Sequence, residues 1–183
     1  MFKQSDILNE KNGKTLREVS SDVTFPMDKK YIELMDEMIN YLRLSQDEEY
    51  ANKNHIRAGM GLAAIQLGVK KRFFVICYKM DDGSFVEYKV VNPKIISNSS
   101  EQIYVEEGEG CLSVTHDIPG IVPRYARVNV SFYDENGNEV NVRVREEIAV
   151  AFQHEIDHLN GILYIDKIDR KNPYKDADKM RAI

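Results

Sequence analysis

Residues 146–161 read Glu-Glu-Ile-Ala-Val-Ala-Phe-Gln-His-Glu-Ile-Asp-His-Leu-Asn-Gly. Apolar side chains recur in this stretch at steps of three and four residues, which predicts an α-helix over residues 146–159 with one apolar face. That face carries Ile148, Phe152, Ile156 and Leu159. Asn160-Gly161 supplies the stop signal, because glycine and, less often, asparagine adopt the left-handed conformation that ends many helices.

His154 and His158 stand four residues apart on the other face of this helix, so both imidazoles can reach one metal ion. Glu155 is rotated by about 100° from His154 and about 60° from His158 around the helix axis, which places its carboxylate beside that ion. A carboxylate there can transfer protons for a water molecule without being a ligand. The alternative is an exposed charged helix with two accidental histidines, a pattern expected by chance in roughly 1% of chains of this length.

A third ligand does not follow downstream, because residues 159–183 contain neither His nor Glu. Upstream, Cys111 lies in the glycine-rich stretch Gly108-Glu109-Gly110-Cys111-Leu112-Ser113. A thiolate with two imidazoles gives three protein ligands and leaves one position open, as in catalytic sites. The alternative for Cys111 is a small buried apolar residue. Cys77 fits that alternative, and His55 and His116 are expected on the surface and in a loop.

The whole chain has the composition of one globular domain spanning residues 1–183. It carries a net charge of −5, 43% hydrophobic residues and two cysteines. No apolar run approaches the ~18–20 residues that cross a bilayer, and the N-terminus lacks a signal sequence. We therefore expect a cytoplasmic protein with reduced thiols and no membrane partner. The acidic balance argues against DNA binding through a basic face.

The remaining pattern predicts an α+β fold with antiparallel strands. A helix is expected after Asp28, where apolar residues from Tyr31 to Leu42 form a stripe. The polar residues 45–54 are expected to form a solvated extension or a surface loop. Strands are expected at residues 73–78, 85–91 and 94–96, with Asn92-Pro93 as a break. Asn136-Gly137 predicts a tight hairpin between strands around residues 128–132 and 140–144. The tail from Asp169 onward carries no clear signal.

Gly59-Met60-Gly61-Leu62-Ala63-Ala64 matches the dinucleotide fingerprint G-x-G-x-x-G/A, but its context does not. No apolar strand precedes Gly59, and the stretch after Leu62 is too short for a crossover helix. The glycines are instead expected to bring a strand edge close to a ligand. Gln66 follows directly, and its side-chain amide can donate to an oxyanion, although a plain surface glutamine is the alternative.

Three segments together resemble the signature motifs of the peptide deformylase family: residues 59–66, 109–113 and 153–161. Val122-Pro123-Arg124 resembles a further family segment, and residues 45–54 resemble the insertion of the longer form found in Gram-positive and related bacteria. The resemblance covers nearly the whole chain and implies antiparallel sheets packed around a central helix that carries the metal-binding histidines. Ile65 departs from the Pro or Thr common in the family.

The resemblance implies a metal-dependent hydrolase that removes the N-formyl group from the formyl-methionine of nascent chains and releases formate. Cys111, His154 and His158 would bind the metal, and Glu155 would transfer protons. Gln66 and the backbone N–H of Leu112 would hold the oxyanion. A larger set would bind the substrate: Gly61 beside the formyl group, Met60, Gly110, Val150 and Ala151 around the methionine, and Arg124 on the peptide backbone or on a carboxylate of the site.

The resemblance implies Fe²⁺ in the cell, one ion per chain, with Zn²⁺, Ni²⁺ or Co²⁺ acceptable to the same ligands. Formyl-methionyl N-termini would be the partners, a place near the ribosome exit is implied, and a monomer is expected. Two other hypotheses stay open at this point. A zinc endopeptidase would need a wide cleft and a third ligand, and a non-catalytic metal module would need a fourth protein ligand such as Cys77.

Overall fold

The computed structural model describes residues 2–116 and 118–183, and its main element is a five-stranded antiparallel sheet in the order β1-β2-β3-β6-β7. The strands are β1 (Gly61–Ala63), β2 (Phe73–Lys79), β3 (Phe85–Asn98), β6 (Arg127–Tyr133) and β7 (Glu139–Arg145). The hairpin between β6 and β7 turns at Asn136-Gly137, as predicted, and Gly137 has φ +87°.

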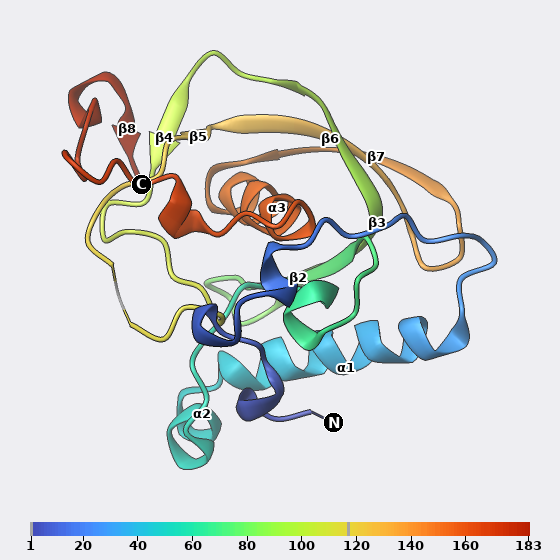
Figure 1. The fold of residues 1–183 in the computed structure, drawn as a ribbon. Helices are drawn as coiled ribbons and strands as arrows, with labels where there is room; N and C mark the ends of the chain where they lie inside the picture. Colours follow the sequence, from blue (N-terminus) through green and yellow to red (C-terminus); the bar gives the residue numbers. More distant parts are fainter. Residues whose placement is uncertain (1, 117) are drawn as a thin grey trace.

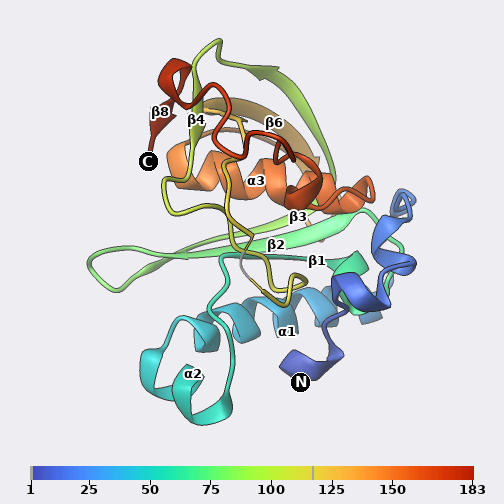
Figure 2. The same cartoon turned by 60° about the vertical axis from the view of Figure 1, so that its left-hand side comes forward.

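Two helices cover opposite faces of this sheet (Figure 2). Strand β2 shows why, because its side chains alternate between two cores. Phe73, Val75 and Cys77 pack in the cluster that includes the apolar face of α1 (Lys29–Ser45). Phe74 and Ile76 pack instead in the cluster with α3 (Glu146–Leu159). The predicted boundaries of α3 are confirmed, and its residues 149–159 are all buried, so the helix is covered on every side.

A smaller sheet covers the far side of α3. It contains β5 (Arg124–Tyr125), β4 (Gln102–Tyr104) and β8 (Arg181–Ala182), with β8 parallel to β4. Figure 1 shows α3 in the middle of the molecule, with the long strands arching around it and β4, β5 and β8 at one end. The predicted α+β class is confirmed, and the β4–β8 pair is the one parallel exception in the described sheets.

Two local details differ from the simplest expectation. Of the two forms expected for residues 45–54, a surface loop does not hold throughout, because Glu48–Asn54 form a short solvated helix, α2, with no buried side chain to give a periodic signal. Asp47 caps this helix by accepting a hydrogen bond from the Tyr50 N–H at 2.8 Å. Asn92-Pro93 does not separate two strands: β3 continues past it through a bulge, with Asn92 at φ +50°.

The chain before α1 forms an N-terminal arm, defined here as residues 2–23. It contains three single-turn 3₁₀ helices: η1 (Gln4–Asp6), η2 (Glu10–Asn12) and η3 (Thr15–Arg17). Its backbone N–H groups bond to carbonyls of distant segments: Leu8 to Gln66 at 2.8 Å, Glu10 to Ser113 at 2.9 Å and Ser20 to Leu159 at 2.9 Å. The arm therefore touches all three segments that the sequence singled out.

Three further 3₁₀ turns complete the described chain. They are η4 (Ala64–Leu67), η5 (Tyr164–Asp166) and η6 (Ala177–Lys179). The tail that the sequence left unassigned, from Asp169 onward, thus contains η6 and strand β8. Within the described residues, none of the helices is both long enough and apolar enough to cross a bilayer.

Candidate metal centre and cleft

Three predicted ligands from distant parts of the chain meet in one place. The ligand atoms of Cys111, His154 and His158 all lie within 4.8 Å of one another, and all three side chains are buried. The thiol sulfur of Cys111 is 3.2 Å from Nε2 of His158. Helix α3 presents the two histidines one turn apart, and the loop after β4 brings Cys111 to them. One sulfur and two imidazole nitrogens fit a divalent transition metal and leave a position for water or substrate.

Glu109 fixes the orientation of His154. Its Oε2 lies 2.8 Å from Nδ1 of His154, so the other ring nitrogen of His154 is left for the metal. Glu109 also accepts hydrogen bonds from Arg124, from Nε at 2.7 Å and from Nη2 at 2.9 Å. Such a carboxylate behind a ligand histidine sets the tautomer and strengthens the ligand.

Arg124 is buried, with 2% of its surface exposed. Besides Glu109, it donates from Nη1 to Oδ2 of Asp157 at 2.5 Å, and Lys167 lies 2.7 Å from the same Asp157 oxygen. Arg124 does not line the cleft described below. Of the two roles expected for it, the structure shows the bonds to carboxylates of the site, and contact with the substrate stays a prediction.

The titratable groups of the centre have shifted pKa values. Burial would raise the pKa of Glu109, but hydrogen bonds from Arg124 and His154 outweigh it and lower the pKa to about 2. Burial would lower the pKa of His154, but Cys111 and Glu109 raise it well above its ordinary value. Burial and the charge of His154 hold the pKa of His158 well below its ordinary value. A neutral His158 keeps the lone pair that a metal ligand needs.

Glu155 lies beside the three ligands and is 3% exposed. Its Oε2 has no hydrogen-bond partner within the described residues. Burial raises the pKa of the Glu155 carboxyl to about 7. A carboxyl with that pKa can take up and release a proton near neutral pH.

Gly61 of β1 makes room for this carboxylate. A Cβ at position 61 would lie 2.3 Å from Oε1 of Glu155, which no real contact allows. The sequence predicted that Gly61 admits the formyl group, and the structure adds the close approach of the Glu155 carboxylate as a second reason for glycine.

Gln66 comes from η4 and points into the same centre. Its Oε1 accepts a hydrogen bond from the Ala63 N–H at 2.8 Å. Its Nε2 donates to Oγ of Ser113 at 2.9 Å and lies 3.8 Å from the Cys111 sulfur. Because an amide nitrogen carries two N–H groups, one is held by Ser113 and the other faces the metal ligands.

A cleft of about 320 Å³ opens onto the centre. Strand β1 and the residues before it form one wall, and α3 with the Gly108–Leu112 stretch forms the other. Most residues assigned to the substrate or the oxyanion from the sequence line this cleft, namely Met60, Gly61, Gln66, Gly110, Leu112, Val150 and Ala151.

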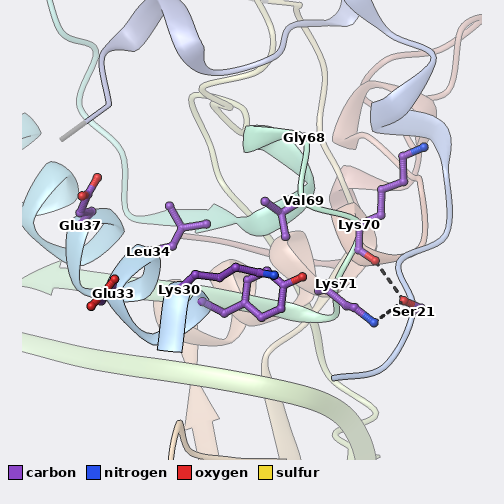
Figure 3. A pocket seen from close by; sticks show the side chains of 10 residues that line it. Ser21, Lys30, Glu33, Leu34, Glu37, Gly68, Val69, Lys70 and Lys71 are labelled. Atoms are coloured by element: carbon purple, nitrogen blue, oxygen red, sulfur yellow. Dashed lines mark hydrogen bonds between the residues drawn. The ribbon is translucent and has the colours of Figure 1, made fainter. Parts of the chain in front are cut away.

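A second hollow of about 720 Å³ lies elsewhere, between α1 and the turn that follows η4 (Figure 3). Its lysines already have partners: Lys30 pairs with Asp28, Lys70 with Glu18, and Lys71 donates to Oγ of Ser21. None of the three metal ligands, nor Glu155, lines it. We therefore assign the chemistry to the smaller cleft.

A profile of the polypeptide deformylase family matches residues 6–174. The chain belongs to the peptide deformylase family. It is 44% identical over 176 residues to a peptide deformylase of Macrococcus caseolyticus, a match that spans 96% of this chain and 95% of that relative. It is 41% identical over 183 residues to peptide deformylase 2 of Bacillus anthracis, covering 100% and 99% of the two chains.

Solved deformylase structures have the same fold. The peptide deformylase of Thermotoga maritima matches with a TM-score of 0.69 and 32% identity over 89% of this chain and 96% of that one. A deformylase of Acinetobacter baumannii bound to Met-Ala-Ser matches with a TM-score of 0.69 and 26% identity, covering 88% and 96%. The activity expected from the sequence is thus confirmed: the chain is a metal-dependent hydrolase that removes the N-formyl group from nascent peptides. The endopeptidase alternative is not supported.

The deformylase site also contains residues whose roles the sequence did not reveal. Glu109 and Asp157 hold Arg124, and Ser113 holds Gln66. The only signal was their position inside the signature segments, beside a ligand or a donor. His55 and His116 are exposed, as expected, and Cys77 is buried away from the metal ligands.

Proposed function

We propose that Cys111, His154 and His158 hold one ferrous ion per chain in the cell, and that Glu155 carries the protons of the deformylation reaction. The observation that carries this proposal is the convergence of the three ligand atoms beside a buried carboxylate with a free oxygen. When bound, such an ion supplies Lewis acidity toward the formyl oxygen and makes water acidic enough to ionise near neutral pH. Zn²⁺, Ni²⁺ and Co²⁺ suit the same ligands, so affinity alone does not select iron.

Glu155 accepts the proton that the attacking water gives up, and delivers it to the methionine nitrogen as the C–N bond breaks. The products are formate and a free amino terminus. Oε2 of Glu155 supports this role because it has no other partner among the described residues. The pKa of about 7 supports it further, since the carboxyl can both accept and donate at the pH of the cell.

Gln66 and the backbone N–H of Leu112 donate hydrogen bonds to the formyl oxygen as negative charge develops on it. Loss of one such donor typically costs about 3–4 kcal/mol of transition-state stabilisation. Gly61 admits the formyl group, and the methionine side chain lies against Met60, Gly110, Val150 and Ala151, all of which line the cleft.

The same proposal covers the enzyme's setting. All of residues 1–183 act as one catalytic domain, because α3 packs against both sheets and the N-terminal arm bonds to all three signature segments. We expect a cytoplasmic monomer that meets formyl-methionyl N-termini near the ribosome exit, where they emerge.

The test is formate release from a formyl-Met peptide by protein purified without oxygen, with bound metal measured in the same sample. Activity should track one ferrous ion per chain and should decay in air, because a ferrous site with an open position and a thiolate ligand is sensitive to oxygen.

Glu155→Gln is the decisive variant. It keeps the size of the side chain but cannot accept a proton, so we expect metal binding to persist and kcat to fall by at least 10²-fold. Glu87→Gln, on β3 outside the cleft, is the matched control and should keep its activity. A Glu155→Gln protein that binds metal and retains full turnover would refute the proton-transfer role.

A further inference from the structure

Two apolar residues that line the cleft, Val105 and Val150, also belong to an apolar cluster outside it. Val150 is buried in this cluster with Ile103 of β4 and with Ala126, and Val105 packs against it. Ile183 packs against the same cluster but does not line the cleft. The part of the chain that follows η6 therefore supports one wall of the cleft without facing the substrate.

The β8 segment, defined here as residues 181–183, is bonded along β4 through its backbone. The N–H of Ile183 donates to the carbonyl of Tyr104 at 3.0 Å, and the N–H of Glu106 donates to the carbonyl of Ile183 at 2.9 Å. These two bonds lie on either side of Val105 in the sequence. They therefore hold the backbone from which the Val105 side chain reaches the cleft.

Arg181 anchors the same segment to helix α3. Its Nη1 and Nη2 donate to the two carboxylate oxygens of Glu146, at 2.9 Å and 2.8 Å. Its Nε donates to Oε1 of Glu101, directly before β4, at 3.0 Å. Figure 2 shows the resulting position of β8, beside β4 and next to one end of α3. The segment is thus tied to both elements that supply the wall, since Val150 follows Glu146 by one helical turn.

Close packing makes the position of a wall residue depend on what lies behind it. Protein interiors are packed as densely as organic crystals, so a core side chain cannot move without displacing its neighbours. Val150 is only 7% exposed, so little of its side chain faces the cleft and the rest is packed in the protein. Removing atoms from Ile183 leaves space into which the wall can recede. A substrate side chain that binds against the wall then loses part of its contact.

We propose that Ile183 is a positioning residue for methionine recognition: packed outside the cleft against the cluster of Val150, it holds the wall against which the methionine side chain of the substrate binds. The inference rests on the proposed function of the cleft and adds a residue that determines its specificity. Ile183 does not touch the substrate or the metal ligands, so its effect is confined to binding of the methionine side chain. The chemical step at the formyl group is left unchanged.

The test compares formate release from formyl-Met-Ala-Ser and from formyl-Ala-Ala-Ser, whose first side chain is too short to fill the methionine site. In nickel-loaded Ile183→Ala we expect kcat/KM for the methionine peptide to fall about fivefold, because part of an apolar pocket contact is lost. The fall should come from KM, with kcat within about twofold of wild type. The alanine peptide should be hydrolysed with kcat/KM within about twofold of wild type, since it makes little use of the wall.

The ratio of the two kcat/KM values is the decisive readout, because it does not depend on the fraction of the sample that is folded and active. Ile183→Val removes less of the side chain and should lower this ratio about twofold, as expected for a graded loss of packing. It also serves as the test if Ile183→Ala does not fold.

Ile32→Ala is the matched control, since Ile32 is a half-buried isoleucine on α1 that packs in the cluster on the other side of the large sheet. It should lower stability and leave the substrate ratio unchanged. A ratio that Ile183→Ala does not change, or an equal loss on both peptides, overturns the inference while the deformylase function stands. If wild type releases no formate from formyl-Met-Ala-Ser, the proposed function fails, and the inference fails with it.

Discussion

Arg124 is a buried cation between two carboxylates, and its environment explains why it stays there. A charge removed from water is tolerated only when its hydrogen bonds are satisfied. Arg124 bonds to both oxygens of Glu109 and to Asp157, and Glu109 in turn holds His154. At the residue scale, the guanidinium is therefore linked to His154 through Glu109.

Cys77 illustrates how burial and a neighbouring carboxylate together control the ionisation of a thiol. It is fully buried on β2, and its thiol lies 3.6 Å from Oε1 of Glu87. Burial, the charge of Glu87 and this hydrogen bond together raise the pKa of Cys77 to about 12. The thiol therefore stays protonated in the folded protein at pH values where an unfolded chain ionises it.

This pKa shift predicts a loss of stability at alkaline pH. Between pH 9 and 12 the unfolded chain releases the thiol proton and the native protein keeps it, so the free energy of unfolding falls as pH rises. From pH 8.5 to 10 the contribution amounts to about 1 kcal/mol. Urea unfolding of the zinc-loaded enzyme and of Cys77→Ala should show a stability difference that shrinks by that amount. Parallel pH profiles would mean that the thiol ionises with its ordinary pKa in the native state.

The cluster of Cys111, His154 and His158, which could hold a metal ion, could be predicted from the sequence, and the partners that support it could not. His154 and His158 are local to one helix, so their spacing alone predicts a shared ion. Glu109 bonds to His154 across 45 residues of sequence, and Arg124 to Asp157 across 33. No local pattern reports such a pairing, which depends on how the β4–β5 region packs against α3.

At the scale of elements, the end of α1 holds the segment that leads into β1. Oγ of Ser45 accepts a hydrogen bond from the Gly59 N–H at 3.2 Å. Nε2 of Gln46 donates to the carbonyls of Gly59 at 2.9 Å and Cys77 at 2.8 Å. Two adjacent side chains therefore fix both backbone groups of Gly59, which lines the cleft. The helix sets where the substrate-facing strand begins.

Gln46→Met should weaken substrate binding more than catalysis. The substitution keeps the side-chain length and removes the donor, which leaves two carbonyls without that partner at a cost of about 1 kcal/mol or more. We expect KM for formyl-Met-Ala-Ser to rise about five- to tenfold and kcat to stay within about twofold, since Glu155 and the ligands lie on other elements. Gln102→Met, an exposed position on β4, is the control. A fall in kcat at constant KM would contradict this positioning role.

Elements with a strong periodic signal were predictable, and those set by tertiary contacts were not. α1 and α3 have apolar stripes, and the β6–β7 hairpin has its Asn-Gly turn. Strand β3 passes Asn92 because the side chain of that residue bonds to both backbone groups of Val23, at 2.8 Å and 2.9 Å. Strand β8 forms only because β4 offers it an edge.

At the scale of the whole molecule, the N-terminal arm contacts the loop that contains Cys111. Besides its backbone bonds, the Glu10 carboxylate accepts hydrogen bonds from the N–H of Thr115, at 3.1 Å and 3.2 Å to its two oxygens, and from Oγ1 at 2.5 Å. Thr115 follows Cys111 by one short turn. The arm thus holds the loop that contains Cys111 and Leu112.

Glu10→Ala should loosen that loop without unfolding the enzyme. We expect nickel-loaded Glu10→Ala to lose its metal to a chelator several times faster than wild type, with kcat reduced about three- to tenfold, since several hydrogen bonds worth about 1 kcal/mol each are lost. Glu18→Ala is the matched control, because Glu18 is also in the arm but pairs with Lys70 on the surface. Equal metal-release rates in the two variants would show that the arm does not act on the centre.

The role of the arm could not be predicted from the sequence, whereas the fold class of the whole molecule could. The three signature segments carry the resemblance to the family, and that resemblance predicted the central helix and the sheets around it. The arm carries no such motif, and its backbone bonds to those segments leave no pattern in the sequence. Only the folded chain shows that Gln66, Ser113 and Leu159 share this support.

The long-range contacts of the arm also affect when, during its own synthesis, the enzyme can become active. Arg17 pairs with Asp166 across 149 residues of sequence, and Glu10 with Thr115 across 105. During synthesis the arm is made before Thr115 and Asp166, so these contacts form only after those residues have been added. A growing chain therefore does not yet contain the complete metal centre. Contacts of such long separation form slowly and late in folding. An enzyme that works on the first residue of newborn chains is thus itself active only after its own last helix has been made.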